Sequence, residues 1–247
     1  MNRTTRLVLF LLGAGVFAVV FVVAAFGLPD FGAAVHTYRD ASVPAALDRA
    51  TPNVVSALVF DQRGIDTLGE VTIVFGSVLG AATLLRLAQD ERTGPDADEP
   101  TPLPVARLFG FVLLPVALVL GVNVVVHGHL TPGGGFQGGV VLATGLHLLY
   151  VAGSYRALRR VRPLSWYHYA EAAGTGAYVL VGCAGLVAGQ RFLANFLPLG
   201  ETGALFSSGT VAVLSVAVGL EVAGGVVILL AQFLQQAISV STERTPS

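Results

Sequence analysis

Long apolar stretches alternate with shorter polar stretches along the whole chain. Six of them are long enough for a helix that crosses a bilayer, which needs about 20 mainly apolar residues. The predicted spans are 7–28, 67–85, 108–126, 134–155, 169–190 and 209–233. Residues 202–242 are assigned one span, because two would use nearly all of them and leave no turn between. The pattern therefore predicts an all-α integral membrane protein with about six transmembrane helices.

The first apolar stretch follows Arg3 and Arg6, as the apolar part of a signal peptide also would. At 22 residues it exceeds the usual apolar region of a signal peptide, about 7–15 residues, and no A-x-A site follows it. We therefore expect a retained span.

Arginine placement predicts the orientation. All 14 basic residues are arginines. With a cytoplasmic N-terminus, four of them lie outside and the other ten, including four in the loop 156–162, lie inside. Cytoplasmic loops carry such an excess of positive charge, so the pattern predicts that both termini are cytoplasmic. The four outside are Arg39, Arg49, Arg63 and Arg191.

Polar segments divide the chain into expected modules. Residues 1–88 form a two-span module with an external loop at 29–66. An acidic, proline-rich cytoplasmic linker follows at 89–106 (QDERTGPDADEPTPLPVA). Residues 107–235 form a four-span domain, and 236–247 form a cytoplasmic tail.

Composition agrees with a membrane protein and narrows the chemistry. Hydrophobic residues make up 54% and charged residues 12%, about half the charge of a soluble domain. A net charge of −1 does not suggest a nucleic-acid partner. A single cysteine, Cys183, excludes an intrachain disulfide and a cysteine-based metal cluster. No nucleophile–base pair or cofactor motif is found, so we expect neither a cofactor nor catalysis by this chain alone.

Carboxylates inside predicted spans are the main functional candidates, because such groups are costly in lipid and usually face a cavity or a partner. Glu221 lies near the middle of the sixth span and must face protein or a polar cavity. Glu171 lies near the start of the fifth span. Glu70 has two interpretations: an ion-handling group, or the last residue of a capping box that begins at Thr67.

Three histidines are weaker candidates. His127 and His129 follow the third span and precede Thr131-Pro132-Gly133. They suit a proton relay or, as the simpler interpretation, the interfacial end of a turn. His147 in the fourth span is either an ion-pathway group or a hydrogen-bonding partner of a neighbouring helix.

Glycines recur at four-residue spacing in the spans, an arrangement that lets helices approach closely in lipid. The pairs are Gly134/Gly138, Gly135/Gly139 and Gly185/Gly189. We interpret Pro132 and Gly133 as part of a turn, and the glycines that follow as packing residues. Packing within this chain is favoured over docking to another protein.

Two stretches resemble a known family. HGHLTPGGGFQGGVVLATGLHLLY (127–150) resembles the B subunit of Mrp-type (Mnh) multisubunit cation/proton antiporters, whose hallmark is H-G-H-x-x-P-G-G-G-F-Q-G-G. This similarity extends over about 105–235. Residues 53–86 resemble the C-terminal end of the large A subunit, which stands alone as a small E-type subunit in related membrane-bound hydrogenases. The pattern there is N-V-V-N-x-x-L-V-D-x-R-G-x-D-T-L-G-E; here Ser56 replaces the second Asn and Phe60 precedes Asp61.

The resemblance implies a non-catalytic subunit of a Na+/H+ antiporter complex in the plasma membrane of a prokaryote. Its implied partners are the other subunits, Na+, H+ and the lipid bilayer. It also implies an ion-pathway role for Glu70, the Glu of the D-T-L-G-E stretch, and adds Asp66 of that stretch as a candidate.

Two alternatives stay open. The same modules recur in the membrane arm of ion-pumping hydrogenases and related oxidoreductases, and nothing in the chain separates the two kinds of complex. A stand-alone transporter or a membrane scaffold is disfavoured, because no convincing inverted repeat with broken helices is found.

Overall fold

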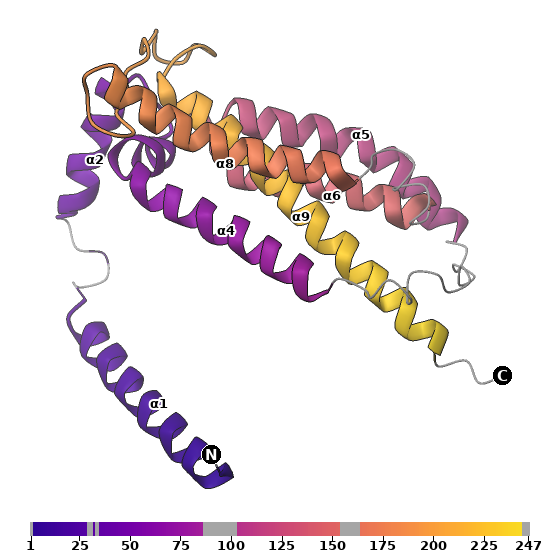
Figure 1. Ribbon diagram of the computed structural model, residues 1–247. Coiled ribbons are helices and arrows are strands. Elements are labelled where there is room, and N and C mark those ends of the chain that lie inside the picture. The colour runs from indigo at the N-terminus through magenta and orange to yellow at the C-terminus, as the bar shows by residue number, and fades with distance from the viewer. Residues whose placement is uncertain (1, 29–31, 33–34, 86–102, 154–163, 244–247) are drawn as a thin grey trace. The chain divides into compact units, whose positions relative to one another are not determined.

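The computed structural model describes residues 2–28, 32, 35–85, 103–153 and 164–243 (Figure 1). The chain forms two compact units, Met1–Ala41 and Ser42–Ser247. Most of the expected linker 89–106 and the arginine-rich loop 156–162 lie outside the described residues.

The first unit contains the first predicted span. Helix α1 (Arg3–Phe26) begins at Asn2, whose side chain accepts a hydrogen bond of 2.8 Å from the backbone N–H of Thr5. Its most apolar 18-residue window has a mean hydropathy of 3.0. Helix α2 (Thr37–Asp48) starts in this unit, where the Arg39 guanidinium lies 2.8 Å from Asp40 and lowers the pKa of that carboxyl.

The second unit is a helical bundle. Its further elements are α3 (Val54–Ala57), the π-helix η1 (Leu58–Gln62), α4 (Gly64–Leu84), α5 (Pro104–Val126), α6 (Gly135–Gly153), α8 (Leu164–Val187) and α9 (Thr210–Glu243). Helices α1, α4, α5, α8 and α9 are each long and apolar enough to cross a membrane. Helix α6, with 19 residues, corresponds to the remaining predicted span. The all-α class with about six spans is confirmed, and the orientation stays a prediction.

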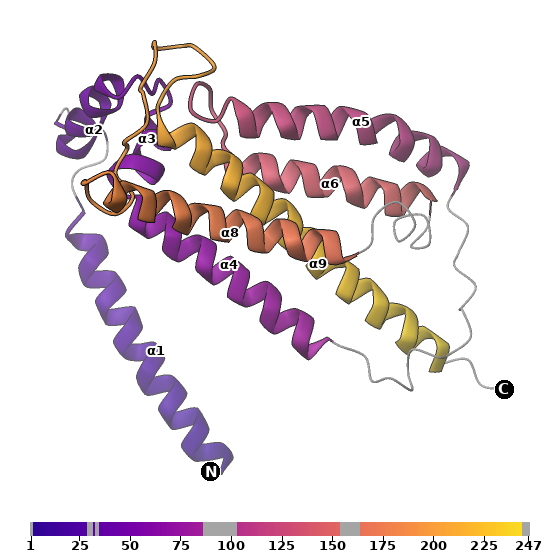
Figure 2. The ribbon, with the colours of Figure 1, turned by 45° about the horizontal axis from the view of Figure 1, so that its top comes forward.

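Helix α9 is the centre of the bundle. It packs against α8, α6 and α4, and α5 pairs with α6 (Figure 2). In the membrane-length window of α9, 61% of the residues are buried, against 28% for α8 and 17% for α4 and α5. The outer helices therefore leave most of their apolar surface to lipid or to other proteins.

Glycines bring the central helices close together. A Cβ at Gly138 of α6 would lie 2.8 Å from the backbone nitrogen of Val125 in α5. A Cβ at Gly139 would lie 2.8 Å from the Cβ of Val222 in α9. Because such distances leave no room for a side chain, these glycines serve packing within this chain.

Two helix boundaries differ from the expectation. Helix α4 begins at Gly64, so Thr67 lies inside the helix, where its hydroxyl donates to the carbonyl of Val59 at 2.8 Å. The capping-box interpretation of Glu70 is therefore wrong. Helix α9 is one continuous helix, as expected for 202–242, but it runs to Glu243 and includes the first residues of the expected tail.

Candidate functional site

The stretch NVVS (53–56) holds the turn that contains the two histidines. The side-chain amide of Asn53 donates to the carbonyls of Gly128 at 2.7 Å and Thr131 at 2.8 Å. The hydroxyl of Ser56 donates to Gly128 at 2.5 Å. The backbone N–H of Asn53 donates to the carbonyl of His129 at 3.1 Å. The two stretches that carry the family resemblance therefore bind each other, and Ser56 fulfils a bonding role although it departs from the Asn of the family pattern.

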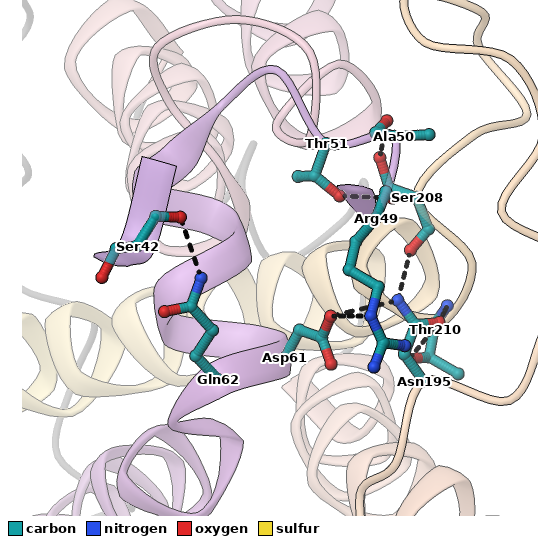
Figure 3. Close-up of polar contacts among 9 residues, drawn as sticks. All are labelled: Ser42, Arg49, Ala50, Thr51, Asp61, Gln62, Asn195, Ser208 and Thr210. Atoms are coloured by element: carbon teal, nitrogen blue, oxygen red, sulfur yellow. Dashed lines mark hydrogen bonds and ion pairs between the residues drawn. The ribbon is translucent and has the colours of Figure 1, made fainter. Parts of the chain in front are cut away.

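A second polar cluster lies at the start of α9 (Figure 3). Asn195 accepts a 2.8 Å hydrogen bond from the backbone N–H of Thr210 and donates to the carbonyl of Ser208 at 3.0 Å. Ser208 in turn donates to the carbonyl of Ala50 at 2.9 Å. This chain of bonds ties the segment before α3 to the first turn of the central helix.

Asp61 of η1 joins this cluster. Its carboxylate lies 3.8 Å from the Arg49 guanidinium and accepts a long hydrogen bond of 3.5 Å from Asn195 (Figure 3). The ion pair is partly exposed, so we expect it to add little to the free energy of unfolding. Its main effect is to orient η1.

The histidines of the turn differ in surroundings. The ring Nδ1 of His127 lies 3.0 Å from the carbonyl of Asn123. His129 is 1% exposed, and none of the described residues makes a hydrogen bond of good geometry to its ring nitrogens. Burial lowers the pKa of His129, which the nearby backbone of Ala204 and Leu205 partly offsets. Among the described residues, no group of three His, Cys, Asp or Glu is arranged to hold a metal ion.

Glu70 lies on the surface of the bundle. It is the seventh residue of α4, about 9 Å along the axis from Gly64. Its side chain is exposed, yet it lies within the membrane-length segment Gly64–Leu84. It is close enough to the buried Tyr178 of α8 to interact with it electrostatically. Asp66, one turn earlier, is exposed and pairs with Arg63 at 2.5 Å.

Glu171 and Glu221, in contrast, lie deep in the bundle. Glu171 of α8 is 4% exposed and Glu221 of α9 is 0% exposed. His147 of α6 is half-buried, and no hydrogen bond from the described residues reaches its Nε2. The sequence candidates thus do not converge on one site: two acids share the α8–α9 interface, and Glu70 lies on the outer face of α4.

Family comparison agrees with this architecture. The model of a family described as a domain related to the MnhB subunit of the Na+/H+ antiporter matches residues 105–228, which include α5, α6, α8 and most of the apolar part of α9. The chain belongs to this family. It is therefore a multi-pass membrane protein of the kind that works as one member of a larger complex.

Relatives of this MnhB-family chain include two antiporter subunits. It is 32% identical to an uncharacterized protein of Methanocaldococcus jannaschii, over 70% of this chain and 74% of that protein. It is 26% identical to the A/B subunit of a probable K+/H+ antiporter of Rhizobium meliloti, over 67% of this chain but 19% of that protein. It is 32% identical to the B subunit of the Na+/H+ antiporter of Bacillus subtilis, over 36% of this chain and 59% of that protein.

Two solved complexes contain a chain with this fold. One is the membrane-bound sulfane sulfur reductase, an archaeal respiratory membrane complex, with a TM-score of 0.73 and 27% identity, covering 92% of this chain and 98% of that one. The other is the Mrp complex of Dietzia sp. DQ12-45-1b, with a TM-score of 0.67 and 26% identity, covering 94% of this chain and 26% of that one. Both are multisubunit assemblies, so the partners of the MnhB-family chain are other membrane subunits.

Sequence reasoning missed Asn195. It assigned no role to this residue, which is a single polar position within the apolar stretch 192–197. A polar residue isolated in this way is typical of a buried hydrogen-bonding group. Its isolated position could therefore have indicated this role.

Replacing Asn195 with alanine is expected to destabilise the bundle. It removes the side-chain cap of α9, worth about 0.5–2 kcal/mol, and one of the two donors to the carbonyl of Ser208, which keeps the backbone N–H of Val211. The thermal midpoint of the purified complex should fall. The exposed Asn123, replaced with alanine, is the matched control and should leave it unchanged. Equal midpoints for both variants would contradict the assigned role.

Proposed function

We propose that this chain is a subunit of a monovalent cation/proton antiporter complex, with Na+ as the exchanged cation, and that Glu70 contributes to the ion pathway at a contact with a neighbouring protein of the complex. The named antiporter relatives and the Mrp complex support the kind of complex. The position of Glu70 supports the role of this residue.

The exposure of Glu70 within a membrane-length helix carries the proposal. A charged side chain at the centre of a bilayer costs about 3 kcal/mol on insertion scales, and such groups usually face protein or a water-filled cavity. Within the described part of this chain the Glu70 side chain is exposed. Another membrane protein of the complex, or a water-filled path beside one, is therefore the surrounding that fits it.

The rest of α4 suits a contact with another protein. Gly69, Gly76 and Gly80 fall on one face of the helix, and a Cβ at any of them would meet no atom of this chain within 4 Å. Small residues at such positions allow a second helix to approach closely in lipid. Asp66 lies one turn before Glu70, on the same side of α4 as Glu70. In this proposal Asp66 lies nearer the entrance of the ion pathway.

The function is tested by exchange in liposomes. The complex is purified in mild detergent through a tag on this chain, reconstituted, and given a preformed pH gradient. We expect added Na+ to collapse the gradient, whereas choline should leave it in place. A complex that responds to no alkali cation would contradict antiport, and one that responds to K+ alone would contradict Na+ as the exchanged ion.

A second candidate is a role in the membrane arm of a respiratory reductase. The likeness to a chain of the sulfane sulfur reductase favours it, because the match covers 98% of that chain. Redox proteins that copurify with the tagged chain would decide for this alternative.

A further inference from the structure

The crossing of α8 and α9 buries two carboxyl groups that the proposed pathway does not use. Glu221 lies about 16 Å along α9 from Thr210, near the middle of the membrane-length segment Thr210–Phe233. No described residue makes a hydrogen bond to either carboxyl oxygen of Glu221 or to Oε1 of Glu171. Buried polar atoms are nearly always hydrogen-bonded, so these oxygens require a ligand.

Glycines make room for both side chains. A Cβ at Gly174 of α8 would lie 2.7 Å from the Cβ of Glu221. A Cβ at Gly225 of α9 would lie 3.2 Å from Oε1 of Glu171 and 3.0 Å from Cγ2 of Val78 in α4. Each glutamate therefore passes a glycine of the opposite helix, and the two carboxyls are close enough to interact electrostatically.

No counter-charge from the packed helices compensates this pair. The described parts of α4, α6, α8 and α9 contain neither Arg nor Lys. An isolated charge in such a site is very costly, and two carboxylates that share a site cannot both remain ionised without compensation. The other titratable groups on these helices are Asp66, Glu70, His147, Tyr150, Tyr167, His168, Tyr169, Tyr178, Cys183 and Glu243.

We propose that Glu171 and Glu221 form one buried proton-binding site, in which the two carboxyls share a proton through an O–H···O hydrogen bond. A proton suits the site better than a metal cation. A carboxylic acid needs a single acceptor for its hydrogen, whereas a hard cation takes several oxygen ligands. No group of three His, Cys, Asp or Glu that could hold a metal is present among the described residues, and Val78 forms part of the surroundings.

The site extends the proposed function without depending on it. In an antiporter complex it would supply a protonatable group in the core of this chain, separate from Glu70 on the outer face of α4. Its existence requires only the buried crossing of α8 and α9. It is therefore tested by readouts that do not measure cation exchange.

Infrared spectroscopy of the intact complex tests the shared proton. The carbonyl stretch of a protonated carboxylic acid shifts when H2O is replaced by D2O, and the difference between wild type and variant isolates the contribution of this site. We expect Glu171→Gln and Glu221→Gln each to shift one protonated-carboxyl band, and the double variant to remove it. Glu201→Gln, at an exposed position between α8 and α9, is the matched control and should leave the spectrum unchanged. A double variant that retains the wild-type band would overturn the proposal.

If the double variant does not assemble, carbodiimide labelling of the wild-type complex tests whether Glu171 or Glu221 is protonated. Dicyclohexylcarbodiimide reacts with protonated carboxyls in apolar surroundings, and peptide mass mapping locates the adduct. An adduct on Glu171 or Glu221 supports the site. Absence of an adduct from both, while other membrane carboxyls of the complex are modified, overturns it. If the unlabelled complex exchanges no cation while the labelled complex carries this adduct, the proposed function is refuted and the proton site still stands.

Discussion

Replacing Glu70 with glutamine is expected to reduce cation–proton exchange to the background level while the complex still assembles. The substitution keeps the volume of the side chain and one acceptor oxygen, replaces the other oxygen with an NH2 donor, and removes the charge. The Glu70 side chain is exposed on α4, and among the described residues its charge interacts with Tyr178 only at the electrostatic level, without an ion pair. Exchange is measured with the reconstituted complex, and assembly by size-exclusion chromatography and protein composition.

Glu201→Gln is the matched control for this experiment, since Glu201 is also exposed but lies outside the helices. It should exchange cations at the wild-type rate. Wild-type exchange by the Glu70→Gln complex would remove Glu70 from the pathway. Loss of a neighbouring protein from that complex would instead show that the charge holds an interface together.

Replacing Gly139 with alanine is expected to weaken the packing of α6 against α9 and to lower the stability of the complex. The new Cβ would lie 2.8 Å from the Cβ of Val222 and 2.9 Å from the carbonyl oxygen of Gly219. Neither atom belongs to the flexible end of a side chain, so the helices must separate. Overpacking of this kind costs roughly 1–3 kcal/mol, which exceeds the roughly 0.5–1 kcal/mol that alanine gains over glycine inside a helix. The measurement is the thermal midpoint of the purified complex, together with the amount of this chain in the membrane.

Gly176→Ala provides the control for Gly139→Ala. Gly176 lies inside α8, and a Cβ there would meet no atom of this chain within 4 Å. Its variant should be as stable as wild type or slightly more stable, because only the helix propensity changes. A stable Gly139→Ala complex would show that α6 and α9 can shift apart without loss.

The spans could be predicted because the bilayer requires each of them separately. A segment that crosses hydrocarbon must satisfy its own backbone hydrogen bonds and present apolar side chains, so 108–126 and 209–233 could be recognised without knowledge of their neighbours. The structure extends these helices to Pro104–Val126 and Thr210–Glu243. Boundaries depend on capping contacts that come from distant parts of the chain, and the bond from Asn195 to Thr210 is one of them.

The candidate site could be predicted only in part. Glu171 and Glu221 were recognised as acids inside spans, but their positions on facing sides of α8 and α9 depend on the rotation of each helix about its axis. The alternation of apolar residues does not determine that rotation, because nearly every position in these helices is apolar. The Gly174 and Gly225 contacts that bring the two acids together therefore emerge only from the packing.

The bonds from Asn53 and Ser56 to the turn at Gly128 have an evolutionary consequence. They join two segments by contacts that require no continuous backbone between them. A gene for such a protein can be split or fused between these segments while the pair still recognises each other. The matching chains of the two solved complexes differ in length, since the likeness covers 98% of one and 26% of the other.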